Sequence, residues 1–160
     1  GEYLRKELQY LLDNNIKEKG EYQLTNALEN MKQKGSKFII GKVKEWLDCG
    51  NKDATVNTNQ RVLEYNGSSI AKSAEIINTE IKHPCFVGEN TIIKDSKIGP
   101  YSSIGSESNI ENSNIENTII QNKTIIKDAR LVNSMIGNEV LFIGKKENQQ
   151  VSLGDFSEQI

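Results

Sequence analysis

Few side chains in this sequence are of the types that carry chemistry at a site. Asp48 has a carboxylate that could hold a divalent cation or, as the plainer alternative, accept the backbone amide of a tight turn before Gly50. His83 is the single histidine, and an imidazole could act as a general base. Cys49 and Cys85 could be nucleophiles only in an activating environment, which nothing in the surrounding sequence predicts. The candidate site residues are therefore Asp48 and His83.

The composition excludes several classes of protein. The 160-residue chain carries 20 Lys and Arg against 22 Asp and Glu, and this mixed surface gives no electrostatic reason to bind nucleic acid. No apolar run reaches about 18 residues, so no transmembrane helix is predicted. No basic segment followed by an apolar one indicates a secretion signal. Two cysteines are too few for a disulfide framework. We expect a cytoplasmic protein with reduced thiols that binds neither nucleic acid nor membrane.

Two amphipathic helices are predicted in the first 35 residues. Leucines at positions 4, 8, 11 and 12 form one apolar stripe, and Asn14-Asn15 ends that helix. The same spacing recurs from Leu24 to Met31, and Gly35 stands where a helix C-terminal glycine would. An isolated helix of this length is marginal in water. We therefore expect the leucine stripe to be buried against other helices, the second half of the chain or another copy of the chain.

The segment that follows reads as a strand and a third helix. Residues 36–43 include Phe38, Ile39, Ile40 and Val43 and predict a short strand, with a strand-to-loop exit at residues 46–50. Asp53 is predicted to cap a helix that runs to about residue 65 and ends before Asn66-Gly67. Residues 2 to 65 are thus expected to be mainly helical.

From residue 70 onward the hydrophobic period changes. Aliphatic residues recur at steps of five or six residues, with one final step of seven. Neither an amphipathic helix nor an alternating strand has this period, whereas a hexapeptide repeat does. The aliphatic residues are Ile70, Ile76, Ile81, Val87, Ile93, Ile98, Ile104, Ile110, Ile115, Ile120, Ile126, Leu131, Ile136 and Ile143.

A second register supports the repeat. The residue two positions before each aliphatic is small, except Leu141 at the last, and glycine follows five of the aliphatics, as expected at a corner. Three hexads make one triangular coil, so every third aliphatic stacks on the next coil. Four to five coils at about 4.8 Å give a prism on the order of 20 Å tall. Residues 151–156 could cap its open end.

This repeat resembles the hexapeptide left-handed β-helix, and the handedness is taken from that resemblance. Such repeats occur in acyltransferases and in C-terminal domains of some sugar nucleotidyltransferases, and the first half favours the latter. Residues 20–28, G-E-Y-Q-L-T-N-A-L, resemble the E-x-x-[IL]-T-D segment of glucose-1-phosphate thymidylyltransferases, with Asn26 in place of Asp. Residues 46–50, W-L-D-C-G, resemble their W-x-D-T-G segment, with Cys49 in place of Thr. Asn59 and Leu63 fall in a stretch similar to N-x-x-[LV]-[LV].

The resemblance covers nearly the whole chain and implies an α+β fold. Residues 1–66 would be a short, mainly helical remnant of an α/β nucleotidyltransferase domain, and residues 67–160 a single-stranded left-handed β-helix with a capping tail. The parent enzyme would join a sugar 1-phosphate to a nucleoside triphosphate, giving an NDP-sugar, with dTDP-glucose expected, and pyrophosphate. In that intact enzyme Asp48 would help to hold Mg²⁺, and Asn26 would be structural.

Several family motifs have no counterpart in this sequence. They are the glycine-rich G-x-G-T-R-x-x-P…P-K loop, the first metal-binding aspartate and the sugar-binding E-K-P, and the first half has no proline. We therefore expect no catalytic or cofactor-binding residue here, a truncated chain that is inactive alone, and a structural role in a homo-oligomer, either a dimer or a trimer.

Two alternatives stay open. A hexapeptide acyltransferase could use His83 as its general base, but its place early in the repeat favours a solvent-facing or corner residue. A purely structural assembly module is the other. Cys85 falls in the small-residue register of the repeat and is interpreted as packing, and Cys49 as inert.

Overall fold

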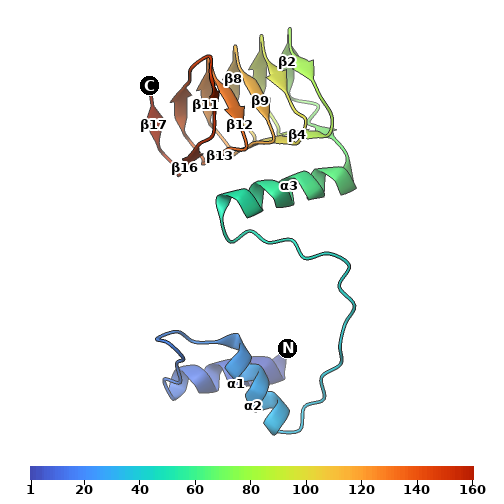
Figure 1. Cartoon of the computed structure of the whole chain (residues 1–160), viewed down its shortest axis with the longest axis vertical. Coiled ribbons are helices and arrows are strands. Elements are labelled where there is room, and N and C mark those ends of the chain that lie inside the picture. The colour runs from blue at the N-terminus through green and yellow to red at the C-terminus, as the bar shows by residue number, and fades with distance from the viewer. The chain divides into compact units, whose positions relative to one another are not determined.

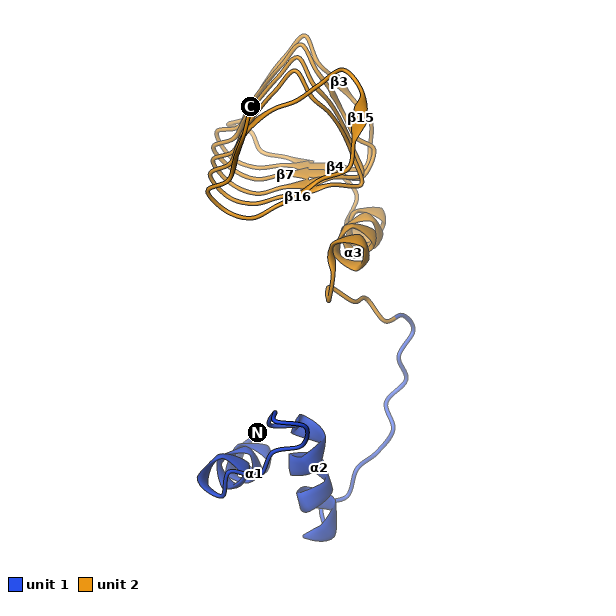
Figure 2. Ribbon diagram, turned by 60° about the vertical axis from the view of Figure 1, so that its left-hand side comes forward, with its two compact units in different colours: residues 1–45 blue, residues 46–160 orange.

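The computed structural model describes all 160 residues as two compact units, residues 1–45 and 46–160 (Figure 2). The first unit contains helices α1 (Glu2–Asp13) and α2 (Leu24–Gln33). The second contains α3 (Lys52–Asn66) and a parallel solenoid of 17 short strands (Figure 1). No helix is both long and apolar enough to cross a membrane. The boundary between the compact units lies before α3, not after it as in the predicted division at residues 66 and 67. The origin of residues 1–66 in a catalytic domain stays a prediction.

The first two helices begin and end close to where the sequence predicts. Asn14 caps the C-terminus of α1, and Asn15 follows in the left-handed region with φ 49°. At the end of α2, Gly35 has φ 89°, and its N–H donates to the Lys32 carbonyl at 3.0 Å. This conformation favours glycine and confirms the predicted stop.

A partly buried ion pair ties α1 to the end of α2. Lys34 Nζ donates to Glu7 Oε1 at 2.6 Å, and Glu7 is only 8% exposed. Leu11 and Ala27 are buried in the same unit. Asn26 lies in the first turn of α2, where its N–H donates to the Gln23 carbonyl at 3.1 Å. A structural role for Asn26 stays a prediction.

The strand predicted at residues 36–43 is wrong. Residues 37–44 form no helix or strand and make no backbone hydrogen bond. Ile39 and Ile40 are 95% and 100% exposed. A strand needs a neighbouring strand to pair with its N–H and C=O groups, and the first unit contains none.

Asn51, and not the predicted Asp53, caps helix α3. The Asn51 side chain accepts the Ala54 N–H at 2.9 Å, and its backbone is extended with φ -153° and ψ 171°. A cap residue needs this extended backbone, and Asp53 is already inside the first turn. The predicted end holds, since α3 stops at Asn66 and Gly67 follows with φ 74°.

The solenoid consists of three parallel sheets, each with one strand per coil, and Figure 2 shows its three-sided cross-section. The first sheet contains β1 (Ser69–Ile70), β4 (Cys85–Val87), β7 (Ser102–Ile104), β10 (Ile119–Ile120), β13 (Met135–Ile136) and β16 (Ser152–Leu153). The second contains β2 (Glu75–Ile77), β5 (Ile92–Lys94), β8 (Asn109–Glu111), β11 (Ile125–Lys127), β14 (Leu141–Ile143) and β17 (Glu158–Gln159). The third contains β3 (Glu80–Ile81), β6 (Lys97–Ile98), β9 (Asn114–Glu116), β12 (Arg130–Val132) and β15 (Asn148–Gln149). This arrangement is consistent with the predicted left-handed β-helix.

The predicted aliphatic columns form the interior of the solenoid. Ile98, Ile104 and Ile110 are completely buried, as are most of the other predicted members. Ile70, in the first coil, is 38% exposed because no coil lies below it. The predicted inward register is therefore confirmed from Ile76 to Ile136, and the exceptions are Ile70 and Ile143 at the two ends of the repeat.

Phe142, and not Ile143, completes the second column. Ile126 pairs with Phe142 in the parallel register, and Phe142 is completely buried. Val140 then takes the small-residue position that the sequence assigned to Leu141. The regular hexad step from Ile136 ends at Phe142, so a six-residue phase decides between two adjacent apolar residues.

Hydroxyl groups explain the small-residue register. Thr124 donates its N–H to Ser108 Oγ at 3.2 Å, and Val140 donates its N–H to Thr124 Oγ1 at 3.2 Å. In another corner, Ser113 donates its N–H to Ser96 Oγ at 3.0 Å. These side chains pair backbone amides that the sheets leave unpaired at the corners.

Close packing, rather than a positive φ, requires most of the corner glycines. A Cβ on Gly88 would lie 2.6 Å from the Ser106 nitrogen, and one on Gly105 would lie 2.6 Å from the Gln121 carbonyl carbon. Of the five predicted corner glycines, Gly99 alone has a positive φ, 89°. The predicted corner positions hold, and these glycines are needed there because a neighbouring coil packs against them.

The tail also differs from the predicted cap. Residues 148–159 add strands β15, β16 and β17 to the three sheets, so they continue the coil.

Candidate functional site

The predicted carboxylate lies in a tight turn just before α3. Asp48 Oδ1 accepts the Gly50 N–H at 3.1 Å, which is the turn interaction considered from the sequence. The carboxylate is exposed, and Oδ2 makes no hydrogen bond. A Cβ on Gly50 would lie 3.3 Å from that Oδ2. The turn therefore orients the carboxylate and leaves one oxygen open to a ligand.

Two threonines of α3 hold the backbone of this turn. Thr58 Oγ1 donates to the Asp48 carbonyl at 2.6 Å, and Thr55 Oγ1 lies 3.3 Å from the Cys49 carbonyl. Thr55 Oγ1 also donates to the Asn51 carbonyl at 2.8 Å. The turn is thus attached to α3 by side chains that the sequence motifs did not single out.

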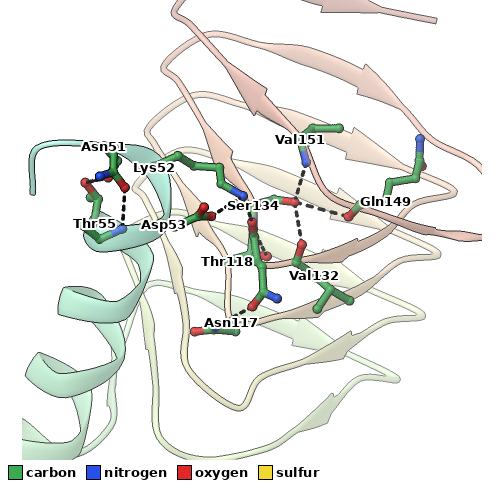
Figure 3. A network of polar contacts seen from close by, with 12 residues as sticks. Asn51, Lys52, Asp53, Thr55, Asn117, Thr118, Val132, Ser134, Gln149 and Val151 are labelled. Atoms are coloured by element: carbon green, nitrogen blue, oxygen red, sulfur yellow. Dashed lines mark hydrogen bonds and ion pairs between the residues drawn. The ribbon is translucent and has the colours of Figure 1, made fainter.

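The solenoid in turn holds α3. Lys52 Nζ donates to the Asn133 carbonyl at 3.0 Å, close to the network drawn in Figure 3. Asn59 Nδ2 donates to the Tyr101 carbonyl at 3.2 Å, and Asn59 Oδ1 accepts the Ser103 hydroxyl at 2.7 Å. Sequence reasoning placed Asn59 in a motif but missed this contact, for which the only signal was a polar residue between the apolar Val56 and Leu63.

The residues present fit a magnesium ion only in part. No group of three or more His, Cys, Asp or Glu side chains could hold a metal ion within this chain. Mg²⁺ is commonly held by one or two carboxylates together with substrate phosphates and water. Asp48, with its open Oδ2, fits one such ligand, and the others would have to come from elsewhere.

His83 lies at the beginning of the solenoid and lacks an acidic partner. Its Nδ1 is 2.5 Å from Ser68 Oγ, and Ser68 Oγ also accepts the Cys85 N–H at 3.0 Å. His83 itself is exposed. The contact joins the chain before β1 to the next coil, and nothing in it orients the imidazole toward a substrate.

The two cysteines are in opposite environments. Cys85 is completely buried in β4, as its place in the small-residue register predicted. Burial raises the pKa of the Cys85 thiol, and a hydrogen bond with Ser68 opposes that shift. Cys49 is exposed, and its carbonyl is the group that faces Thr55. Cys85 is therefore a residue of the packed interior, as predicted.

An open groove of about 1020 Å³ follows the corner between the second and third sheets and was not predicted. Its rim carries a ladder in which Asn78 Nδ2 donates to Asp95 Oδ1 at 2.6 Å and Asn112 Nδ2 donates to Asp128 Oδ1 at 2.5 Å. All four residues have positive φ, a conformation in which Asn and Asp are enriched. These hydrogen bonds pair the polar side chains of one corner with those of the next coil.

A smaller apolar hollow of about 330 Å³ lies on the first unit. Leu8, Leu11, Leu12, Tyr22, Gln23 and Leu24 line it. Leu11 is buried, but Leu8 and Leu12 are 37% and 50% exposed. The leucine stripe of α1 is thus only partly covered within one chain.

Comparison with known proteins gives a consistent result. No family model matches the chain. It is 28% identical to glucose-1-phosphate thymidylyltransferase of Streptomyces antibioticus over 140 residues, which cover 76% of this chain and 39% of that protein. The Streptomyces griseus enzyme of the same name is 25% identical over 87% of this chain and 45% of its own length. The bifunctional protein GlmU of Clostridioides difficile is 31% identical over 99% of this chain and 38% of its own length.

The chain spans less than half the length of each of these relatives, and the matches fall in their C-terminal regions. The resemblance deduced from the motifs and the repeat is thereby confirmed. The chain is homologous to the C-terminal region of sugar-1-phosphate nucleotidyltransferases, with a three-sided β-solenoid as its main folded part.

Proposed function

We propose that this chain is the C-terminal part of an enzyme that joins a sugar 1-phosphate to a nucleoside triphosphate, releasing pyrophosphate. The alignment with two glucose-1-phosphate thymidylyltransferases supports dTDP-glucose as the product. The observation that carries the proposal is the exposed Asp48 carboxylate, held in a turn of the matching W-L-D-C-G segment with one oxygen open. A cytoplasmic location belongs to the same proposal.

The chemistry requires close approach of several negative charges. A sugar phosphate attacks the α-phosphorus of the triphosphate and pyrophosphate leaves, so phosphate oxygens crowd together. Mg²⁺, when bound, neutralises part of that charge. Asp48 would hold the ion through Oδ2, while its Oδ1 stays on the Gly50 amide. The rest of the site would come from the region that precedes the aligned part in the longer relatives.

By itself the chain is proposed to be inactive and to serve structure and assembly. The sequence carries no glycine-rich phosphate loop, and no group of three or more His, Cys, Asp or Glu side chains could hold a metal ion. The purified 160-residue chain should release no pyrophosphate from dTTP and glucose 1-phosphate with Mg²⁺. Turnover by the pure chain would show that its catalytic groups have been misidentified.

Asp48→Asn in the full-length protein that contains this chain tests the proposal directly. With dTTP and glucose 1-phosphate, Mg²⁺-dependent turnover should fall by about two orders of magnitude or more, as expected when a charged group at the reacting phosphates is lost. Asp53→Asn is the matched control, because Asp53 is also exposed and pairs only with Lys52. Wild-type turnover in Asp48→Asn with an intact fold would remove Asp48 from the site.

We also propose that the chain forms a homo-oligomer, a dimer or a trimer, through the uncovered leucines of α1. Leu8, Leu12 and Leu24 expose apolar surface around the hollow, and covering such surface stabilises association. Sedimentation equilibrium over a wide concentration range should show a species heavier than 18.0 kDa. Leu8→Glu with Leu12→Glu should shift it to the monomer. A single 18.0 kDa species for the wild-type chain at every concentration would contradict the proposal.

A further inference from the structure

Helix α3 and the solenoid share a common spacing. Lys52 and Asn59 are seven residues apart on α3, which corresponds to a rise of about 10.5 Å. Their partners, Asn133 before β13 and Tyr101 before β7, lie two coils apart in the first sheet, which corresponds to about 9.6 Å. The helix therefore runs along the stacking direction, as Figure 1 shows, with polar contacts at matching intervals.

One face of α3 carries all of these contacts. Val56 and Leu63 are 3% and 6% exposed, and Asn59 lies between them at helical spacing. Asn59 uses both ends of its amide, donating to Tyr101 and accepting from Ser103. The apolar burial and the bidentate amide together fix the rotation of the helix on the solenoid.

The neighbouring residue, Thr58, makes the connection to the candidate site. Its hydroxyl donates to the Asp48 carbonyl at 2.6 Å, a short contact across ten residues of chain. The turn has few other contacts with α3, the clearest being that of Thr55 with the Cys49 carbonyl at 3.3 Å. The position of the Asp48 carboxylate thus depends on where α3 holds Thr58.

We propose that Thr58 is a positioning residue for Asp48, and that the solenoid sets this position through Asn59. In this role the solenoid contributes to metal binding without any contact with the metal or the substrates. The inference rests on the proposed function for its catalytic consequence. The positioning itself is a property of residues 46–160 and can be measured in the chain alone.

The first experiment measures the turn in the 160-residue chain. Amide hydrogen exchange at Gly50, followed by NMR, should be about five- to tenfold faster in Thr58→Val, as expected from the loss of one hydrogen bond that closes the turn. Thr58→Ser keeps the donor and should restore the wild-type rate. Amides in β7 to β13 should not change in either variant, which separates a local effect from unfolding.

The second experiment measures Mg²⁺ use by the full-length protein. In Thr58→Val the Mg²⁺ concentration at half-maximal turnover should rise by about tenfold, the result of a misplaced ligand, while KM for glucose 1-phosphate stays unchanged. Thr58→Ser should restore the wild-type Mg²⁺ requirement. Ser103→Ala should raise the Mg²⁺ concentration at half-maximal turnover by less than Thr58→Val does. Asn57→Ala, at the exposed residue beside Thr58 on α3, is the control and should leave the Mg²⁺ requirement unchanged.

The outcomes separate this inference from the proposed function. If the full-length wild-type protein transfers no nucleotidyl group, the proposed function fails, and Gly50 exchange in the chain still decides whether Thr58 positions the turn. If the Gly50 amide exchanged at the wild-type rate in Thr58→Val, the inference would be overturned. Faster exchange with an unchanged Mg²⁺ requirement in an active enzyme would overturn it as well, because the turn would then move without consequence for the metal.

Discussion

Replacement of Thr124 by valine tests the hydroxyl ladder inside the solenoid. Thr124 is completely buried, and its Oγ1 donates to the Gly137 carbonyl at 2.8 Å while accepting the Val140 N–H at 3.2 Å. Valine has nearly the same shape, so Thr124→Val removes the hydroxyl and leaves no cavity. The substitution therefore isolates the hydrogen bonds from the packing.

The expected loss follows from the two groups left without a partner. A buried donor or acceptor that loses its partner costs about 1–3 kcal/mol. The Val140 N–H has no other partner, whereas a carbonyl such as that of Gly137 tolerates the loss better. Thr124→Val should therefore lower the free energy of unfolding by about 2–4 kcal/mol.

Urea unfolding followed by the circular dichroism of the strands measures this difference. The midpoint should fall with an unchanged m-value, since the same surface is exposed on unfolding. Thr124→Ser keeps the hydroxyl and should lose no more than about 1 kcal/mol, the contribution of one buried methyl group. If Thr124→Val were as stable as the wild-type chain, the hydroxyl ladder would contribute nothing, and the small-residue register would reflect volume alone.

Two further predictions concern the packing of the coils. Gly105→Ala should lower the free energy of unfolding by about 1–3 kcal/mol in the same urea assay, because its Cβ would meet the backbone of the next coil at 2.6 Å, whereas Gly154→Ala, with no atom within 4 Å, should have little effect. Cys85 should react with a thiol reagent far more slowly than the exposed Cys49. Because the pKa of Cys85 is raised by burial, stability should fall as pH rises above about 8.5, where the unfolded thiol ionises first, and Cys85→Ala should abolish that loss.

The inward register of the solenoid could be predicted because two independent positions repeat with the same period. Ile98, Ile104 and Ile110 were identified as core residues from spacing alone, and all are completely buried. The end of the repeat was predicted less well. Phe142 and Ile143 are both apolar and adjacent, and the sequence prediction took Ile143 although a regular six-residue step from Ile136 ends at Phe142. The structure pairs Phe142 with Ile126 and buries it completely.

Other errors arose where a local signal has two equivalent solutions or a distant partner. Asn51 and Asp53 are both good caps, and the extended backbone at Asn51 decides between them. Residues 36–43 are rich in the aromatic and β-branched residues that are common in strands. A strand also needs a partner strand, and the composition of one segment cannot predict whether that partner exists. The contacts of Asn59 with the Tyr101 carbonyl and the Ser103 hydroxyl depend on residues 42 and 44 positions away. The polar residue between Val56 and Leu63 was a signal, but it does not identify these partners.

The boundary between the compact units changes how the sequence motifs should be understood. The W-L-D-C-G segment begins at Trp46, the first residue of the second unit, so Asp48 belongs to the same compact unit as the solenoid. The motif alone would assign Asp48 to a catalytic domain and the repeat to a separate module. The hydrogen bonds of Thr58 with Asp48, and of Asn59 with Tyr101 and Ser103, connect the turn to the solenoid through α3. By the proposal above, a displacement of that coil would move the turn through one helix. Substitutions inside the solenoid should therefore reach the candidate site through α3, even where they contact no substrate.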